Sequence, residues 1–285
     1  MSAERGEASW AALGTTLRRI AGLGLIADGT RALRIGHSLV LGLLVPKTTG
    51  QSPGRVATGT LAGAAEVIGG LALLEATPLA VPQLYHFFAR FYDPTSRLWR
   101  HFLFPDVQAA FDRALRAYLP ADGAILDLGC GTGANLARLR ALDLPFGSYV
   151  GIDLTPEMLA VAEKKLGHLP NVRFQQVNLL TDPLPDGPFD VIVSTWVFSH
   201  LPDPEVVVAK ALRRLRPGGR AIFLFLADPG GWVSPLEDLL LRPFSARAVP
   251  EEAYRQFPDL SDVQAFAGDT IAMAVLKAAT RSSAF

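Results

Sequence analysis

The sequence predicts an α/β fold in which helices cover both faces of a doubly wound, mainly parallel sheet of seven strands. From residue 105 onwards, short apolar runs alternate with segments of helical periodicity. The run at residues 189–198 is almost continuously apolar, which indicates a strand that is buried on both faces. Repeated strand–helix units imply right-handed crossovers, and these produce a parallel sheet.

The order of elements follows from local signals. Helices are expected over residues 107–119 and 157–166, after the glycine-rich turn that ends at residue 133, and after Asp203. Strands are expected over residues 124–128, 149–154, 172–179, 189–198, 220–226, 262–266 and 270–277, the last two as a hairpin. Thr155 and Pro156 provide an N-cap and a first-turn proline. Arg213, Arg214 and Arg216 are expected in the last turn of the helix after Asp203, where they would complement its dipole.

The composition of residues 1–84 predicts a hydrophobic helical region that precedes the alternating strands and helices. Residues 56–74 carry one charged side chain, Glu66, and as a helix would be about 28 Å long, close to the ~30 Å hydrocarbon thickness of a membrane. A charge near the centre of a span costs about 2.5 to 3.5 kcal/mol, and the small side chains around Glu66 offset little of it. Two interpretations stay open: a membrane-inserted or membrane-surface appendage, and a helical hairpin that packs against a neighbouring helix or a second subunit.

Composition narrows the classes of function. Lys+Arg and Asp+Glu both number 27, so no overall charge indicates a nucleic-acid partner. The single cysteine, Cys130, excludes an internal disulfide and a cysteine-based zinc cluster, and no metal-ligand spacing is present. Residues 1–10 lack the pattern of a signal peptide, which favours a cytoplasmic location. The hydrophobic fraction of 49% is high for a plain cytosolic enzyme, so the cytoplasmic face of a membrane is the alternative.

The turn after the first strand has the composition of a nucleotide-binding turn. Gly129, Gly131 and Gly133 lie between a short apolar strand and a helix. Backbone N–H groups and the positive end of the helix meet there, and glycine lets the backbone come close to a ligand. Gly129, Gly131 and Ala134 also satisfy the G-x-G-x-x-G/A pattern, so a nicotinamide or flavin enzyme is the alternative.

The run DLGCGTG at residues 127–133 closely resembles the first motif of the class I S-adenosylmethionine-dependent methyltransferases. The resemblance continues through GID at residues 151–153, FDVIV at residues 189–193 and LRPGG at residues 215–219. It covers residues 105–277. It implies the Rossmann-like methyltransferase fold for the domain at residues 105–285, with S-adenosyl-L-methionine as the cofactor.

Roles for individual residues follow at the carboxyl edge of the sheet. Asp153, at the end of the second strand, can accept hydrogen bonds from both ribose hydroxyls. By resemblance, Asn178 would contact the adenine amino group, while Asp127 and the carbonyls near Thr195 would hold the methionine ammonium. The predicted cofactor-binding residues are Asp127, Gly129, Cys130, Gly131, Thr132, Gly133, Asp153, Leu154, Met158, Asn178, Leu179 and Thr195, of which Leu154, Met158 and Leu179 would enclose the adenine ring.

The predicted catalytic residues are His200 and Tyr92. His200 is the only histidine expected at the carboxyl edge, and a base is needed only where the acceptor loses a proton. Tyr92 belongs to an aromatic-rich connector or lid at residues 85–104, where it resembles a Tyr-Asp element found before the first motif in many small-molecule and lipid methyltransferases. In those relatives the element caps the cofactor pocket and faces the acceptor. His86 and His101 are weaker candidates.

These features predict methyl transfer to a hydrophobic acceptor, either a lipid or a small molecule such as a quinone-like ring, at a membrane surface if the N-terminal region associates with one. An insertion at residues 229–258 is expected to share in acceptor specificity through its aromatic side chains, Trp232, Phe244, Tyr254 and Phe257. Two alternatives remain. One is methylation of a soluble metabolite, with residues 1–84 forming a homo-oligomer contact. The other is a non-catalytic relative that keeps the cofactor pocket for binding or regulation.

Overall fold

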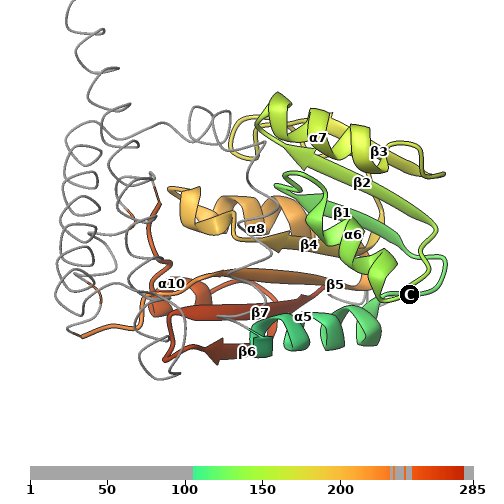
Figure 1. Cartoon of the computed structure of the whole chain (residues 1–285). Coiled ribbons are helices and arrows are strands. Elements are labelled where there is room, and N and C mark those ends of the chain that lie inside the picture. The colour runs from blue at the N-terminus through green and yellow to red at the C-terminus, as the bar shows by residue number, and fades with distance from the viewer. Residues whose placement is uncertain (1–104, 232–233, 235–240, 242–245, 279–285) are drawn as a thin grey trace, which may run out of the picture. The chain divides into compact units, whose positions relative to one another are not determined.

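The computed structural model describes residues 105–231, 234, 241 and 246–278 (Figure 1). The predicted N-terminal region, the connector at residues 85–104 with Tyr92, and Trp232 and Phe244 of the insertion lie outside the described residues. Among the helices of the described ranges, none combines the length and the hydropathy that crossing a membrane would require.

Seven strands form one mixed sheet in the order β3-β2-β1-β4-β5-β7-β6. They are β1 (Ala124–Leu128), β2 (Ser148–Asp153), β3 (Val172–Gln176), β4 (Phe189–Thr195), β5 (Leu215–Leu226), β6 (Leu260–Phe266) and β7 (Ile271–Lys277). The strands β1 to β5 pair in parallel, and β7 runs antiparallel to both β5 and β6. The doubly wound, mainly parallel sheet with a terminal hairpin is therefore confirmed.

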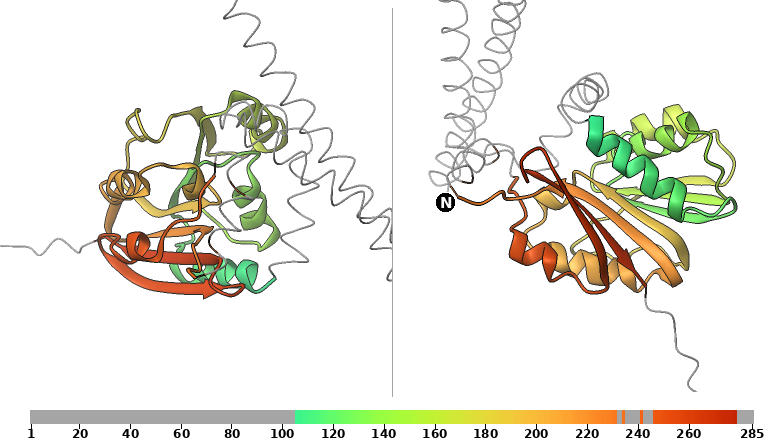
Figure 2. Two further views of the ribbon diagram at one scale, coloured as in Figure 1. Left: turned by 90° about the vertical axis from the view of Figure 1, so that its left-hand side faces the viewer. Right: turned by 90° about the horizontal axis from the view of Figure 1, so that it is seen from below.

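Helices cover both faces of the sheet (Figures 1 and 2). The helices α5 (Pro105–Tyr118), α6 (Ala134–Ala141) and α7 (Pro156–Leu166) lie on one face, and α8 (Pro204–Leu212) and α10 (Glu251–Arg255) lie on the other. The helices α5, α6, α7 and α8 each bury several side chains against the strands, and α10 buries Tyr254. On α5 these side chains include Phe111 and Leu115, and on α8 they include Val207 and Val208.

The strands β1 and β4, on either side of the switch in strand order, are buried almost throughout. The first six residues of β4 are all buried, as predicted for a strand that is covered on both faces. Because β2 and β3 follow from β1 on one side and β5 from β4 on the other, the carboxyl ends of β1 and β4 flank the crevice where such sheets bind ligands.

Several predicted boundaries were wrong. The strand predicted to end at residue 198 ends at Thr195, because Trp196 adopts φ 66° and a 3-10 turn follows at Phe198–His200. The strand predicted to end at residue 179 ends at Gln176, so Asn178 and Leu179 lie in the loop beyond it.

The predicted place of the three arginines was also wrong. The helix α8 ends at Leu212, and β5 already begins at Leu215, because its pairing with β4 shifts register between Phe189 and Val191 and so accommodates the Pro-Gly-Gly run. Arg214 and Arg216 therefore form ion pairs with Asp186 and Asp190, both at 2.9 Å.

Two aromatic side chains of the insertion belong to the core. Tyr254 and Phe257 are each 3% exposed. The Tyr254 ring lies 5.5 Å from that of Phe225, and the Phe257 ring lies 6.1 Å from that of Phe198. The aromatic area of these two residues is used in packing on β5 and the 3-10 turn, so a contribution of the insertion to acceptor specificity, which stays a prediction, would have to come from its other residues.

Candidate functional site

A cavity of about 310 Å³ opens at the carboxyl ends of β1, β2 and β4. Its lining is mostly apolar, and Asp153 is the one acidic side chain among the described residues that line it. The lining residues predicted from the sequence are Gly129, Gly131, Asp153, Leu154, Met158, Leu179, Thr195 and His200. These predicted residues therefore come together around one cavity at the carboxyl edge of the sheet.

The glycine-rich turn brings the backbone to the wall of this cavity. Gly129 adopts φ 69°, and a Cβ there would lie 2.2 Å from Cγ2 of Val197, which also lines the cavity. Gly131 adopts φ 53°, and a Cβ there would lie 3.3 Å from Cε of Met158. Only glycine meets both demands, a left-handed backbone and no side chain at the points of closest approach.

Asp153 presents its carboxylate to the cavity from the end of β2. Its Oδ2 accepts a hydrogen bond from the N–H of Gly131 at 2.9 Å, and its Oδ1 accepts one from the N–H of Thr155 at 2.9 Å. The side chain of Thr155 and the backbone N–H of Leu154 also interact with this carboxylate and stabilise its ionised form. Two fixed oxygens match the paired hydroxyls of a ribose, so the role predicted for Asp153 is compatible with the geometry.

Asp127 lies behind the cavity and does not line it. Its side chain is fully buried, with Oδ1 accepting from Nδ2 of Asn135 at 3.0 Å and Oδ2 accepting from the hydroxyl of Tyr149. Nδ2 of Asn135 also lies 3.2 Å from Oγ1 of Thr195, a lining residue. Asp127 thus reaches the cavity through Asn135 and Thr195, not by the direct contact expected from the sequence.

The two carboxylates make this end of the sheet electrostatically unusual. The pKa of Asp127 is raised from 3.8 to about 7, mainly because its carboxyl is buried and to a smaller extent because of the nearby charge of Asp153, while the hydrogen bonds from Tyr149 and Asn135 oppose the rise. Burial also raises the pKa of Asp153. Neither carboxylate forms an ion pair with an arginine or lysine within the described ranges. A cationic ligand in the cavity would stabilise both in their ionised form.

The remaining predicted residues support the turn without lining the cavity. Cys130 and Thr132 are buried, and a Cβ on Gly151 of β2 would lie 2.9 Å from Sγ of Cys130. Burial raises the pKa of the Cys130 thiol well above its usual range, which keeps it protonated. Gly133 is absent from the lining. Oδ1 of Asn178 accepts from the N–H of Leu180 at 3.0 Å, so this side chain shapes its own loop.

Sequence reasoning missed Thr155, Leu180 and Leu201 among the lining residues. It placed Trp196 and Val197 at this edge, at the end of the strand predicted over residues 189–198, without giving them a role. Trp196 has a left-handed backbone, which is uncommon for a bulky residue, and no sequence pattern signals it. Val197 and Leu201 continue the apolar run of the strand, and that run was the available signal. His200 lies among them in the 3-10 turn, with its backbone N–H donating to the carbonyl of Val197 at 2.8 Å.

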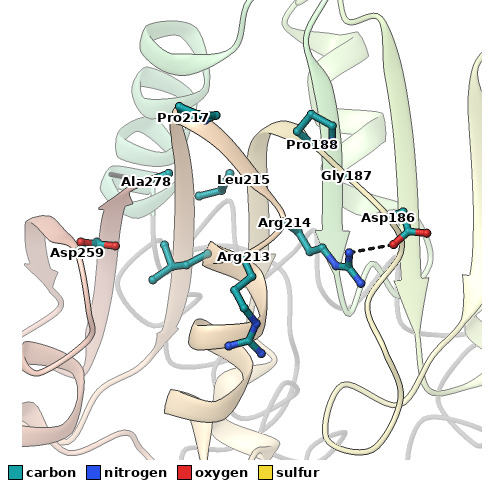
Figure 3. A pocket seen from close by; sticks show the side chains of 10 residues that line it. Asp186, Gly187, Pro188, Arg213, Arg214, Leu215, Pro217, Asp259 and Ala278 are labelled. Atoms are coloured by element: carbon teal, nitrogen blue, oxygen red, sulfur yellow. Dashed lines mark hydrogen bonds and ion pairs between the residues drawn. The ribbon is translucent and has the colours of Figure 1, made fainter. Parts of the chain in front are cut away.

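A second hollow, of about 910 Å³, lies at the opposite end of β4 and β5 (Figure 3). Arg213, Arg214, Asp186 and Asp259 surround it, and Arg214 forms an ion pair with Asp186 across part of it (Figure 3). It lies where the parallel strands β4 and β5 begin, and Ala278 in its lining follows the end of the antiparallel strand β7. Within the part of the chain that the structure describes, no cluster of three or more His, Cys, Asp or Glu side chains could hold a metal ion.

Comparisons with known proteins point to one family. A family model described as a methyltransferase domain matches residues 126–223. A demethylmenaquinone methyltransferase of Thermus thermophilus is 34% identical over 166 residues, which cover 54% of this chain and 72% of that protein. A trans-aconitate 2-methyltransferase of Deinococcus radiodurans is 36% identical over 118 residues, 41% of this chain and 43% of the relative.

Other relatives are matched over shorter stretches. An arsenite methyltransferase of Aquipseudomonas alcaligenes is 40% identical over 108 residues, 35% of this chain and 31% of that protein. The chain therefore spans less than half the length of two of these three curated relatives. The methyltransferase in a Haloferax volcanii complex with the Trm112 methyltransferase activator shares the fold, with a TM-score of 0.57, 17% identity and coverage of 71% of this chain and 99% of that one.

Proposed function

Because this chain belongs to the class I S-adenosylmethionine-dependent methyltransferases, we propose that it transfers a methyl group from S-adenosylmethionine to an apolar small-molecule or lipid acceptor. The observation that carries the proposal is the cavity at the switch point, where the carboxylate of Asp153 meets an apolar wall and the buried carboxylate of Asp127 lies behind it. Among the described residues, neither carboxylate forms an ion pair with a lysine or an arginine. Bound S-adenosylmethionine supplies an electrophilic methyl group on a positively charged sulfonium.

The residues around the cavity fit the three parts of this cofactor. Asp153 would accept hydrogen bonds from the ribose hydroxyls. Leu154, Met158 and Leu179 provide an apolar slot for the adenine ring. Thr195, backed by Asn135 and the negative charge of Asp127, faces the methionine end. In-line approach of the acceptor then depends on orientation, which can lower the barrier by several kcal/mol.

The acceptor would contact the apolar part of the lining around the 3-10 turn. Trp196, Val197 and Leu201 surround His200 there, and they offer few polar groups to a substrate. Such a surface favours an apolar acceptor. The similarity to a protein named demethylmenaquinone methyltransferase supports a quinone-like ring. The hydrophobic composition of residues 1–84 supports an acceptor that is held in, or reached from, the cytoplasmic face of a membrane.

His200 is the residue we assign to proton removal when the acceptor is a phenol or a carbon acid. Tyr92 stays a prediction as its partner at the acceptor. For such acceptors the loss of general-base help lowers the rate about 10²- to 10⁴-fold, whereas an amine that arrives neutral needs only positioning. The effect of a His200 substitution therefore also reports the class of acceptor.

The test is methyl transfer from isotopically labelled S-adenosylmethionine by the full chain. The acceptors are a prenylated naphthoquinol in detergent and trans-aconitate in buffer, with His200→Gln compared with wild type. His168→Gln is the control, because His168 is an exposed histidine on the surface. The proposal expects label in the naphthoquinol, and a rate that falls in His200→Gln but not in His168→Gln.

A soluble acceptor is the second candidate, since the chain is also similar to trans-aconitate 2-methyltransferases. Label in trans-aconitate alone would establish that candidate and remove the apolar one. Binding of S-adenosylmethionine without transfer to either compound, or to any compound of a cell extract, would favour the non-catalytic alternative.

A further inference from the structure

The loop that follows β3 forms one wall of the cavity. It comprises residues 177–182, and Leu179 and Leu180 from it line the cavity. Leu179 is 7% exposed and Leu180 is 37% exposed, so packing alone holds the first of them more firmly than the second. If the proposed function holds, this is the wall that meets the adenine ring.

Asn178 and Asp182 close this loop on itself. The N–H of Asp182 donates to the carbonyl of Asn178 at 2.9 Å, and the N–H of Asn178 donates back to Oδ2 of Asp182 at 2.8 Å. The N–H of Leu180 donates to Oδ1 of Asn178 at 3.0 Å. These bonds satisfy N–H groups of the loop, and they leave several of its carbonyl oxygens without a partner inside the loop.

Lys210 satisfies those carbonyls from another element. Its Nζ lies 2.9 Å from the carbonyl oxygen of Leu179, 2.8 Å from that of Leu180 and 3.1 Å from that of Asp182. A lysine ammonium has three N–H donors and no acceptor. All three donors can therefore be used at once, each on a different carbonyl of the same loop.

The helix that carries Lys210 is a rigid support. Lys210 belongs to α8, whose Val207, Val208 and Ala211 are fully buried in the core. A side chain anchored on this helix holds the loop at a fixed distance from the sheet face. A lysine on a solvated helix face would be free to move in water, but this one is held by three carbonyls and faces the charge of Asp182.

We propose that Lys210 is a positioning residue for the cofactor: its ammonium fixes the backbone of residues 179–182, so that Leu179 and Leu180 form the apolar wall of the cavity. This inference rests on the proposed function for the identity of the ligand. Without the ammonium, three carbonyls turn towards water and the loop relaxes. The free protein then has to restore the wall each time a ligand binds, which weakens affinity.

An arginine cannot reproduce this contact. Its guanidinium places its donors in a planar fork, whereas the three carbonyls converge on a single nitrogen. Lys210→Arg therefore keeps the charge and loses the geometry. We expect its ligand affinity to lie between those of wild type and Lys210→Met.

The experiment uses calorimetric titration of the full chain with S-adenosylhomocysteine and with adenosine, and amide hydrogen exchange of the free protein. Lys210→Met should weaken binding of both ligands about tenfold or more, because both contain the adenine ring. Amide exchange at Leu180 and Asp182 should accelerate. Lys164→Met, an exposed lysine of α7, should change neither quantity.

Val207→Ala separates positioning from general stability. It removes buried methyl groups from the same helix and should lower the melting temperature while leaving ligand affinity and loop exchange unchanged. Affinity within twofold of wild type in Lys210→Met, together with unchanged exchange at Leu180 and Asp182, would overturn the inference. If Lys210→Met does not fold, Lys210→Arg is compared in the same way. Failure of the wild-type chain to bind S-adenosylhomocysteine would instead overturn the proposed function, and exchange in the free protein would still test the role of Lys210.

Discussion

The carboxylates at the two ends of the parallel sheet differ in the partners that compensate their charge. At the amino end, Asp186 pairs with Arg214, and Asp190 pairs with Arg216 and accepts the N–H of Ala124 at 2.8 Å. At the carboxyl end, the hydrogen bonds that Asp127 and Asp153 accept from the described residues come from neutral groups. Two carboxylates at the amino end are thus paired with arginines, whereas those at the carboxyl end have no lysine or arginine partner among the described residues, and a cationic ligand could supply that charge.

This difference distinguishes a structural hollow from a binding cavity better than size does. The hollow at the amino end is about 910 Å³ and the cavity at the carboxyl end is about 310 Å³. Yet Asp186 at the larger one is 94% exposed and already paired, so solvent and Arg214 compensate its charge. Buried carboxylates without such compensation are typical of functional sites.

The largest expected effect is that of a methyl group at Gly129. In Gly129→Ala the new Cβ would overlap Cγ2 of Val197 at a left-handed backbone position, so the turn must move away from the cavity. We expect affinity for S-adenosylhomocysteine to fall at least ~100-fold by calorimetry, equivalent to about 2.7 kcal/mol.

The matched control is Gly218→Ala at the other end of the sheet. Gly218 also has a left-handed backbone, with φ 81°, but no atom lies within 4 Å of the position of a Cβ. This variant should lower stability by about 1 to 2 kcal/mol and leave affinity unchanged. Equal loss of affinity in both variants would mean that backbone strain, and not the close approach at the cavity, governs binding.

The pH dependence of binding is the next effect in size. The pKa of Asp127 is raised from 3.8 to about 7, so a cationic ligand, which favours the ionised carboxylate, should bind more tightly as pH rises through about 7. The same shift acts on folding in the opposite sense. The folded state binds the proton of the Asp127 carboxyl more tightly than the unfolded chain does. This proton therefore contributes fully to stability below about pH 4, and the contribution is lost as pH rises through about 7.

Tyr149→Phe tests the origin of this dependence. The Tyr149 hydroxyl donates to Asp127 and lowers its pKa, and burial raises the pKa of Tyr149 well above its usual range, which keeps it a donor. Without the hydroxyl the pKa of Asp127 should be higher, so the rise in affinity for the cationic ligand, S-adenosylmethionine, should occur at higher pH. Calorimetric titrations from about pH 6 to 8.5 measure this. The control is Tyr118→Phe, at the partly exposed end of α5. Identical pH profiles of affinity for wild type and Tyr149→Phe would contradict the assignment of the pH dependence to Asp127.

The smallest effect is expected at the amino end. Asp186→Asn removes an exposed ion pair and should change stability by less than about 1 kcal/mol in chemical denaturation, with no change in ligand affinity. A measurable loss of affinity for S-adenosylhomocysteine would mean that the two ends of the sheet are coupled and that the comparison between them fails.

The sequence predicted those parts of the site that depend on local signals. Glycine spacing identified Gly129 and Gly131, and an acid at the end of an apolar strand identified Asp153, because strand ends of a parallel sheet converge on one edge. The order of elements followed from apolar periodicity. The boundaries that were wrong lie at Trp196, whose left-handed backbone has no sequence signal, and at a register shift that extended β5.

The supporting contacts could not be predicted, because each joins residues that are distant in the chain. Tyr149 reaches Asp127 across 22 residues, and Lys210 reaches Leu179 across 31. Periodicity predicted Tyr149 as a strand residue, and nothing in the sequence paired it with Asp127. The same argument explains why the sequence did not predict that Tyr254 and Phe257 are core residues. They belong to an aromatic-rich insertion, and they pack into the core because the chain returns to β5.

The most direct test of the central claim is a calorimetric titration of the full chain and of Asp153→Ala with S-adenosylmethionine and with NAD. Asp153 offers a fixed carboxylate to the ribose, and hydrogen bonds to a charged acceptor contribute about 1.5 to 3 kcal/mol each. The predicted result is binding of S-adenosylmethionine by the wild-type chain, at least ~tenfold weaker binding in a folded Asp153→Ala protein, and no binding of NAD. Unchanged affinity in Asp153→Ala, or binding of NAD in place of S-adenosylmethionine, would contradict the assignment of the carboxyl-end cavity as the S-adenosylmethionine site.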